Sequence, residues 1–358
     1  MKILFFTEGR FTPTSRFRVE QYIAYFEKEG ISCKVIEAVP SKYGIILKFL
    51  NFTGGRFIST RITCLFSTLK RFFDVFYYPS KFDMVFVQRD LSFMLKSPIL
   101  ESIIYKKNPN IIFDFDDFIC MKSEYDNNVS HERKIRKIID FSKTIIVGNK
   151  YLKNWVAEDD KTIFIPTSVD TLKFVPNYCK HKVSSSKIVI GWTGTSSNFP
   201  YLLSIKPVLE KLLCNNNIEI RFISNKPLPE LQYIGARFIK WSPSSEVRDL
   251  QEFDIGLAPL FNNQWTSGKC ALKVCLYMSV GMPVVVSPIG HVNEIVEDGV
   301  DGFFANDDKE WYDKINMLVN NPDLKVQMGL SGRNKIEKQY SVSTNLAKYI
   351  EIFSDSKG

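Results

Sequence analysis

Residues Ser267–Ser287, "SGKCALKVCLYMSVGMPVVVS", indicate the class of fold most clearly. Its middle predicts a short helix over Ala271–Val280, which Gly281 stops. Pro283 then opens an apolar, β-branched run that is typical of a buried strand. A helix followed at once by such a strand is the repeating unit of a parallel α/β sheet.

Two lysines stand at the start of this helix, four residues apart and therefore on one face. A helix start already carries partial positive charge, so cations there are disfavoured. In open α/β sheets, ligands bind at the carboxyl ends of strands, where helix starts direct free N–H groups outward. We expect an anion, a diphosphate, to bind Ser267, Gly268, Lys269, Cys270 and Lys273. The alternative is that both lysines are ordinary solvated surface residues.

Strands and helices alternate on both sides of this stretch. The predicted strands are 2–6, 32–38, 82–88, 110–115, 144–149 and 162–166, and then 187–192, 218–224, 236–241, 254–260, 283–287 and 301–305. Helical spacing is found at 19–29 and near 201–213, and the tail from about 308 is helical throughout. The pattern runs twice and predicts two doubly wound, Rossmann-like α/β domains that face each other across a cleft.

The length of 358 residues also favours two domains. We expect a first domain over 1–170, a polar linker over 171–187 and a second domain over 188–339. The linker is predicted from Pro176 and a serine triplet at 184–186.

Composition limits the class of protein. Hydrophobic residues make up 45% and charged residues 24%, as in soluble globular proteins. Seven scattered cysteines and the lack of a secretory segment after Met1 favour a reducing cytoplasm. The three histidines lie far apart, so we expect no metal site built on them. The sequence has no run of 18 apolar residues, so we expect no membrane-spanning helix.

The net charge of +8 is uneven, with 26 Lys and Arg against 20 Asp and Glu in residues 1–170. A positive excess indicates a negatively charged partner. Nucleic acid is not expected, because the basic residues form no known reader motif. Segment 42–78 holds six basic residues among aromatic and aliphatic ones, and its only acid is Asp74. This composition is typical of segments that lie on anionic membranes, but two ordinary helices packed on the sheet explain it equally well.

Two more loops follow strand ends and suit phosphate. The first, "FTEGRFTPTSRFRVEQY", places Arg16 and Arg18 near a helix start, and arginine offers bidentate contacts to phosphate. The second, "GWTGTSSNF", offers Gly194, Thr195 and Ser196 as backbone and hydroxyl donors. It lacks the full dinucleotide-binding glycine pattern, so it is a weak signal by itself.

An acidic cluster, "FDFDD", ends an apolar strand at Asp114, Asp116 and Asp117. Carboxylates in such a place are costly unless they are paired or used. They would bind a divalent metal, handle an acceptor hydroxyl or cap a helix; the residues alone do not choose among these.

Four stretches resemble one known family: "SVGMPVVVSPIGHVNEIVEDGVDGFFA" (279–305), "FIPTSVDTLKF" (164–174), "EFDIGLAPL" (252–260) and "YSVSTNLAKYIEIF" (340–353). They are similar to the family-four-type retaining glycosyltransferases, which have the GT-B fold. The likeness runs through most of the second predicted domain and thinly through the first.

The resemblance implies transfer of a sugar from a nucleotide-diphosphate sugar with retained configuration, no required metal and no cofactor. The donor would bind the second domain. The acceptor, a glycan or a lipid-linked molecule, would bind the first domain. The final helix, about 340–358, would pack back onto the first domain. Lys273 matches a lysine that stabilises the leaving diphosphate. Asp116 or Asp117 takes the place of a catalytic-region histidine.

The resemblance further implies nucleoside contacts at Trp241 and Leu276, and a role in bacterial surface polysaccharide, lipopolysaccharide or glycolipid synthesis. The enzyme would be cytoplasmic, at the inner face of the plasma membrane. The sequence departs from the family where Gly268 and Leu276 replace two glutamates that have seven residues between them, and where "SRFR" replaces a glycine pair. An inactive scaffold that binds a nucleotide sugar or glycan is the alternative.

Overall fold

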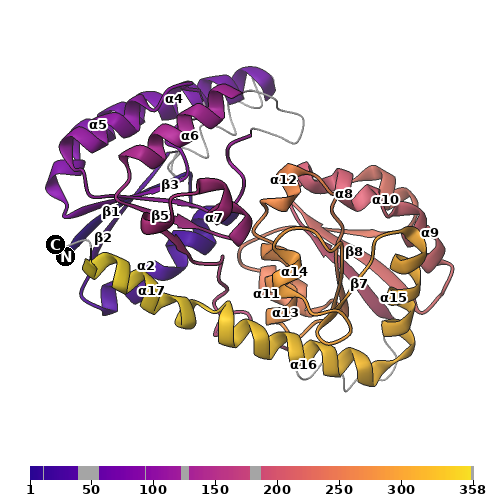
Figure 1. The fold of residues 1–358 in the computed structure, drawn as a ribbon. Helices are drawn as coiled ribbons and strands as arrows, with labels where there is room; N and C mark the ends of the chain where they lie inside the picture. Colours follow the sequence, from indigo (N-terminus) through magenta and orange to yellow (C-terminus); the bar gives the residue numbers. More distant parts are fainter. Residues whose placement is uncertain (11, 39–55, 93, 122–128, 178–186, 356–358) are drawn as a thin grey trace. The chain divides into compact units, whose positions relative to one another are not determined.

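The computed structural model describes residues 1–358 except 11, 39–55, 93, 122–128, 178–186 and 356–358, and except the side chains of 56–64 and 129–130. The chain divides into two compact units. The first comprises residues 1–167 and the stretch that begins at Asn345, and the second is Ser168–Thr344. Each unit contains one six-stranded parallel sheet (Figure 1).

The first sheet has the strand order β2-β1-β3-β4-β5-β6. Its strands are β1 (Lys2–Thr7), β2 (Ser32–Glu37), β3 (Met84–Gln88), β4 (Ile111–Phe115), β5 (Thr144–Val147) and β6 (Thr162–Phe164). Every residue of β3 and β4 is buried, as expected for central strands of a parallel sheet covered on both faces.

Helices cover both faces of this sheet. They are α1 (Pro13–Ser15), the π-helix η1 (Arg16–Glu20), α2 (Gln21–Lys28), α4 (Arg56–Tyr77), η3 (Pro79–Lys81), α5 (Ile99–Lys107), α6 (Val129–Phe141), α7 (Lys150–Val156), η4 (Asp159–Lys161) and α17 (Val342–Asp355). α4, α5 and α6 lie side by side over one face (Figure 1). On the other face, Tyr349 and Phe353 of α17 pack against Phe26 of α2 and Phe5 of β1. The end of the chain is thereby built into the first unit.

The second sheet has the strand order β12-β11-β10-β7-β8-β9. Its strands are β7 (Ile188–Thr193), β8 (Ile218–Ser224), β9 (Arg237–Lys240), β10 (Ile255–Ala258), β11 (Val284–Val286) and β12 (Gly302–Phe304). The helices are η6 (Ser196–Asn198), α8 (Phe199–Leu203), α9 (Lys206–Leu213), α10 (Pro229–Tyr233), α11 (Glu246–Gln251), α12 (Gln264–Ser267), α13 (Leu272–Ser279), α14 (Val292–Ile295), α15 (Asp308–Asn320) and α16 (Pro322–Gln339). Both sheets confirm the predicted strands and the doubly wound α/β class.

The stretch Ser267–Ser287 folds as its residues predict. Residues 272–279 form α13, with Ala271 and Val280 as its caps, and Gly281 follows at φ +72°. This left-handed conformation is open to glycine at little cost and ends the helix. β11 then pairs in parallel with β10, so α13 connects two adjacent strands.

Of the predicted linker 171–187, residues 171–177 and 187 are described, and 178–186 lie outside the described residues. Its first part is held firmly, because the buried Arg333 of α16 donates hydrogen bonds to the carbonyls of Thr171, Phe174 and Ser279. The same limit applies to segment 42–78, of which residues 42–55 are not described.

Candidate functional site

Tyr277, in the second turn of α13, ties this helix to the carboxyl ends of β7 and β10. The hydroxyl of Tyr277 accepts a hydrogen bond from the Thr193 amide at 2.7 Å. The same hydroxyl donates to the carbonyl of Leu257 at 3.3 Å. Ala271, the N-cap of α13, adopts φ +53°, which is strained for a residue with a side chain. The backbone is thus held in a costly turn at the place where ligands of such sheets bind.

Lys273 lies in the first turn of α13 and has no acceptor. Its ammonium nitrogen is buried and makes no hydrogen bond in the described structure. It lies 4.6 Å from the centroid of the Trp192 ring, at the end of β7. Burial, and after it the charge of Lys269, lowers the pKa of Lys273 to about 7. A buried cation without an acceptor is costly, and a bound anion would supply what is missing.

Lys269 lies beside the same strand end. Its ammonium donates to Asn198 Oδ1 at 3.4 Å and lies 5.6 Å from the Tyr201 ring and 5.5 Å from the Trp265 ring. The structure therefore brings together Lys269, Lys273 and the loop after β7.

The loop after β7 differs from the prediction in its donors. The amide of Gly194 donates to the Ile223 carbonyl at 3.1 Å, and that of Ser196 donates to Asn225 Oδ1 at 2.8 Å. Both predicted backbone donors are thus already used within the protein. The hydroxyl of the exposed Thr195 accepts from Asn198 at 3.0 Å. Gly194 has a packing role instead, because a Cβ there would lie 2.6 Å from the Trp192 ring.

In the segment before α13, Lys269 is partly exposed, and the residues around it mainly hold the local structure together. Ser267 donates its hydroxyl to the Asn263 carbonyl at 2.9 Å, which closes the short helix α12. Gly268 and Cys270 are buried on either side of the half-buried Lys269. Predicted ligand contacts through Ser267, Gly268 and Cys270 remain predictions.

The two predicted nucleoside contacts lie in different settings. Trp241 follows β9, is half-buried, and donates from Nε1 to Glu246 at 3.0 Å. Leu276 belongs to the buried residues of α13 and offers no polar atom to a ribose. The structure leaves both contacts as predictions.

In the first unit, an ion cluster stands at the carboxyl ends of β1, β3 and β4. The guanidinium of Arg89 lies 2.9 Å from Asp117 Oδ2, 3.5 Å from Asp116 Oδ1 and 3.5 Å from Glu8 Oε1. Arg89 itself has φ +59°, a conformation that is strained for a side-chain-bearing residue. Strain of this kind persists where surrounding contacts impose it.

Asp116 is the buried member of this cluster. Burial, and after it the neighbouring Asp117, raises the pKa of Asp116 to about 6, while Arg89 opposes the rise. Thr167 donates its hydroxyl to Asp116 Oδ2 at 3.3 Å. A carboxyl that changes charge near neutrality at a strand end suits proton handling or the orientation of a sugar hydroxyl.

Arg18 takes a different role from the predicted one. Its guanidinium is buried, pairs with Asp114 and donates to the Ile165 carbonyl at 2.6 Å. Although burial favours the neutral form, the Asp114 carboxylate raises the pKa of Arg18 well above its usual value. A side chain engaged in this way argues against the predicted phosphate contact. Arg16 stays half-buried, with its guanidinium 5.0 Å from the Phe17 ring.

The three aspartates do not gather as a metal site. Asp114 is paired with Arg18, whereas Asp116 and Asp117 are paired with Arg89. Among the described residues, no group of three or more His, Cys, Asp or Glu side chains is placed to hold a metal ion.

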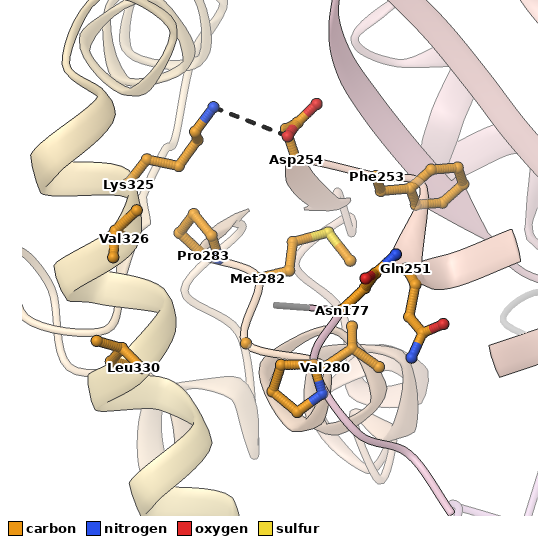
Figure 2. A pocket seen from close by; sticks show the side chains of 12 residues that line it. Asn177, Gln251, Phe253, Asp254, Val280, Met282, Pro283, Lys325, Val326 and Leu330 are labelled. Atoms are coloured by element: carbon orange, nitrogen blue, oxygen red, sulfur yellow. Dashed lines mark ion pairs between the residues drawn. The ribbon is translucent and has the colours of Figure 1, made fainter. Parts of the chain in front are cut away.

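A separate cavity of about 100 Å³ lies at the other end of the strands of the second sheet (Figure 2). Phe253 and Asp254 precede β10, and Pro283 precedes β11, so the cavity is at the amino ends of these strands. The ion pair Lys325–Asp254, 3.8 Å, ties α16 to this edge, and Asp254 also accepts from the Val189 amide at 2.8 Å. We interpret this cavity as part of the helix packing, not as the ligand site.

Sequence reasoning missed four residues of these sites: Glu8, Arg89, Trp192 and Asn198. Glu8 and Arg89 directly follow β1 and β3, so the rule that singled out the aspartates after β4 would have found both. For Trp192, the sequence pattern predicts only a position in a strand. Nothing in the spacing of residues predicts that its ring lies beneath Lys273.

The second unit is similar to a known protein family. Residues 188–321, which include α13, match the family model described as Glycosyl transferases group 1. A stretch of 87 residues is 25% identical to trehalose synthase of Pyrococcus horikoshii. That match covers 24% of this chain and 21% of the relative, so it spans about a fifth of the relative's length.

Solved structures resemble the whole chain. HepE of Anabaena, in complex with UDP and glucose, has a TM-score of 0.68 at 13% identity, over 99% of each chain. A glycosyltransferase from Rickettsia africae has 0.70 at 14% identity, over 99% of this chain and 98% of its own. Sucrose-phosphate synthase of Thermosynechococcus elongatus has 0.71 at 10% identity, with the same coverage. The chain therefore has the two-domain α/β GT-B fold, and its second unit matches the group 1 glycosyltransferase family model.

Proposed function

We propose that this protein is a glycosyltransferase that moves a sugar from a nucleotide-diphosphate sugar to an acceptor with retained anomeric configuration. One observation carries the proposal: at a helix start, beside Lys269, the buried ammonium of Lys273 has no acceptor among the described residues. A diphosphate has the charge to satisfy both lysines. The family model covers this segment, and HepE of Anabaena was solved with UDP and glucose, which supports UDP-glucose as the first donor to test.

In the proposed reaction, the bond between the anomeric carbon and the diphosphate oxygen breaks, and the acceptor hydroxyl oxygen bonds to the same face of that carbon. The acceptor proton passes to the departing phosphate oxygen. Lys273 and Lys269 stabilise the negative charge that develops on the diphosphate, which is the interaction that lowers the barrier. Because two ammonium groups occupy this place, the proposed transfer requires no metal ion and should proceed in a chelator.

We assign the acceptor to the first unit. The cluster of Arg89, Asp116, Asp117 and Glu8 offers carboxylates at strand ends, which suit sugar hydroxyls. Asp116 would orient the acceptor hydroxyl in its ionised form. A glycan or lipid-linked acceptor, and a role in bacterial surface polysaccharide or glycolipid synthesis, are parts of the proposal that follow from the family resemblance.

The test combines binding with product formation. A thermal-shift screen of UDP, GDP, ADP and their sugars should find a nucleotide that raises the melting temperature, because a ligand that binds only the folded state stabilises it. Mass spectrometry of the same mixtures, with sugar and lipid acceptors, should then detect a glycosylated product. Absence of both binding and product across the panel would contradict the proposal.

A second candidate is a nucleotide-sugar binding protein without turnover. It is favoured by Gly268 and Leu276, which stand where many family members have glutamates. Calorimetric binding of a nucleotide sugar, with neither product nor hydrolysis, would select this candidate over the enzyme.

A further inference from the structure

One face of α4 keeps large apolar side chains exposed. Phe73 is 78% exposed, and its companions recur at helical spacing along the described part of the helix. The α4 stripe comprises Leu65, Phe66, Leu69, Phe73, Phe76 and Tyr77, each at least 50% exposed. The opposite face is buried, with Val75 in the core of the first unit. The buried side also holds Thr68 and Arg71, whereas the exposed stripe is apolar and has no cover from the sheet.

Lysines surround the aromatic end of this stripe. Their ammonium groups lie over successive rings: Lys81 over Tyr77 at 3.1 Å, Lys34 over Tyr78 at 4.8 Å and Lys107 over Phe76 at 5.7 Å. These lysines come from β2, η3 and α5, so three separate elements place cations at the same edge. The one acid of residues 56–82, Asp74, is neutralised by Lys70 at 2.6 Å.

The neighbouring helices of the same layer add positive charge. α5 packs against both α4 and α6 (Figure 1). A hollow of about 560 Å³ between the start of α5 and α6 is bordered by Lys96, Arg133, Arg136 and Lys137, and Glu132 is the one acid among the described residues that line it. Glu132 lies 3.7 Å from Arg136, so it is partly neutralised.

The exposed rings and the lysines beside them indicate what kind of partner binds the α4 stripe. Aromatic rings with lysines beside them suit the boundary between acyl chains and phosphate headgroups. A second copy of the chain fits less well, because a two-fold interface pairs this stripe with itself and so brings no unpaired acid to the lysines. No described helix is long and apolar enough to cross a bilayer. The stripe has the geometry of a helix that lies in the surface of a membrane.

We propose that α4 docks this protein on an anionic phospholipid bilayer. The stripe enters the outer acyl region, and Lys34, Lys81 and Lys107 contact lipid phosphates. The hollow between α5 and α6 holds further headgroups by the same charge attraction. None of the residues of this surface belongs to the candidate sugar-transfer site, so the docking proposal does not depend on whether the chain transfers a sugar.

Vesicle flotation with the full-length protein tests the proposal. Vesicles of phosphatidylcholine with 30% phosphatidylglycerol (about a third anionic lipid) should carry the protein upward, whereas pure phosphatidylcholine should carry little. The double substitution Phe73→Ser with Phe76→Ser should lower the bound fraction about tenfold, through lost apolar insertion. Lys81→Glu with Lys107→Glu should lower it as well, and salt should weaken the wild-type binding.

The matched control removes equally exposed apolar side chains elsewhere. Leu172 and Tyr233, 82% and 92% exposed, lie in the second unit, and their serine variants should bind vesicles like the wild type. Unchanged melting temperatures would show that all variants fold. The proposal is overturned if the wild type does not float with anionic vesicles, or if the control loses as much binding as the stripe variant. It is also overturned if light scattering shows a dimer that the Phe73 and Phe76 substitutions dissociate, since a second copy then covers the stripe.

Discussion

The ammonium of Lys273 lies 4.6 Å from the centroid of the Trp192 ring, and its nitrogen has no hydrogen-bond acceptor in the described structure. The indole ring supports the cation from one side without neutralising it. Lys269 adds like charge from the preceding turn. The free protein therefore carries an unfavourable cation at this place, and a bound anion would remove that cost.

Replacing this lysine should stabilise the free protein while removing its function. Lys273→Met should raise the free energy of unfolding by about 1–4 kcal/mol at pH 7, because the depressed pKa means that folding disfavours the charged form. Turnover should fall by about 10²–10³-fold or more. Lys314, also 4.6 Å from a ring centroid, is the matched control, and Lys314→Met should leave turnover unchanged. Urea unfolding and a product assay check both effects.

Nucleotide binding should take up a proton. The pKa of Lys273 is about 7 in the free protein, and a diphosphate beside it would raise that value. Affinity should therefore weaken as the pH rises above 7, because an increasing share of the lysines must first bind a proton. Calorimetry at pH 8 in two buffers of different ionisation enthalpy measures the uptake. Proton release on binding, or equal heats in both buffers with Lys273 intact, would contradict this assignment.

The pH dependence of transfer should reflect Asp116. With a pKa of about 6, this carboxyl is protonated below that pH, so the rate should fall as the pH drops through 6. Asp116→Asn should lower kcat about 10²-fold and remove the acidic limb, with little change in KM for the donor. Rates between pH 5 and 8 provide the check. An acidic limb that persists in the variant would assign it to another group.

Packing beneath Lys273 should be sensitive to one added methyl group. Gly194→Ala places a Cβ 2.6 Å from the Trp192 ring, which must move and carry its support away from the ammonium. The cost in folding free energy should be about 1–3 kcal/mol, and donor affinity should weaken. Adding Trp192→Phe makes room and should restore part of the stability. Failure of this second substitution to help would show that the two residues are not coupled.

Arg18 should prove structural. Arg18→Met leaves the buried Asp114 unpaired and should cost about 3–5 kcal/mol. The double variant Arg18→Met with Asp114→Leu removes both charges and should recover much of that loss. Nucleotide affinity of the double variant should match the wild type, whereas a large loss of affinity would restore the phosphate contact that the sequence suggested.

The strands and α13 were predictable because buried parallel strands are continuous apolar runs and Gly281 marks a helix end. The strand ends then located the lysines and the acidic cluster. The sequence did not show which way individual side chains point. Arg16 and Arg18 look alike in the chain, but the π-helix over 16–20 turns them differently, and Arg18 reaches the interior.

The sequence also did not show which backbone amides already donate hydrogen bonds within the protein. Gly194 and Ser196 look like anion donors, but their amides bind Ile223 and Asn225, residues 29 positions farther along the chain. Such long-range partners leave no periodic signal. Likewise, the apolar residues of α4 fit a buried helix equally well until the structure shows which of them stay exposed.

A crystal structure with bound UDP would locate the diphosphate. Its oxygens are expected within hydrogen-bond distance, about 2.7–3.2 Å, of Nζ of Lys273, with Lys269 beside them. A nucleotide whose phosphorus atoms lie away from the start of α13, with the Lys273 ammonium still lacking an acceptor, would contradict this expectation.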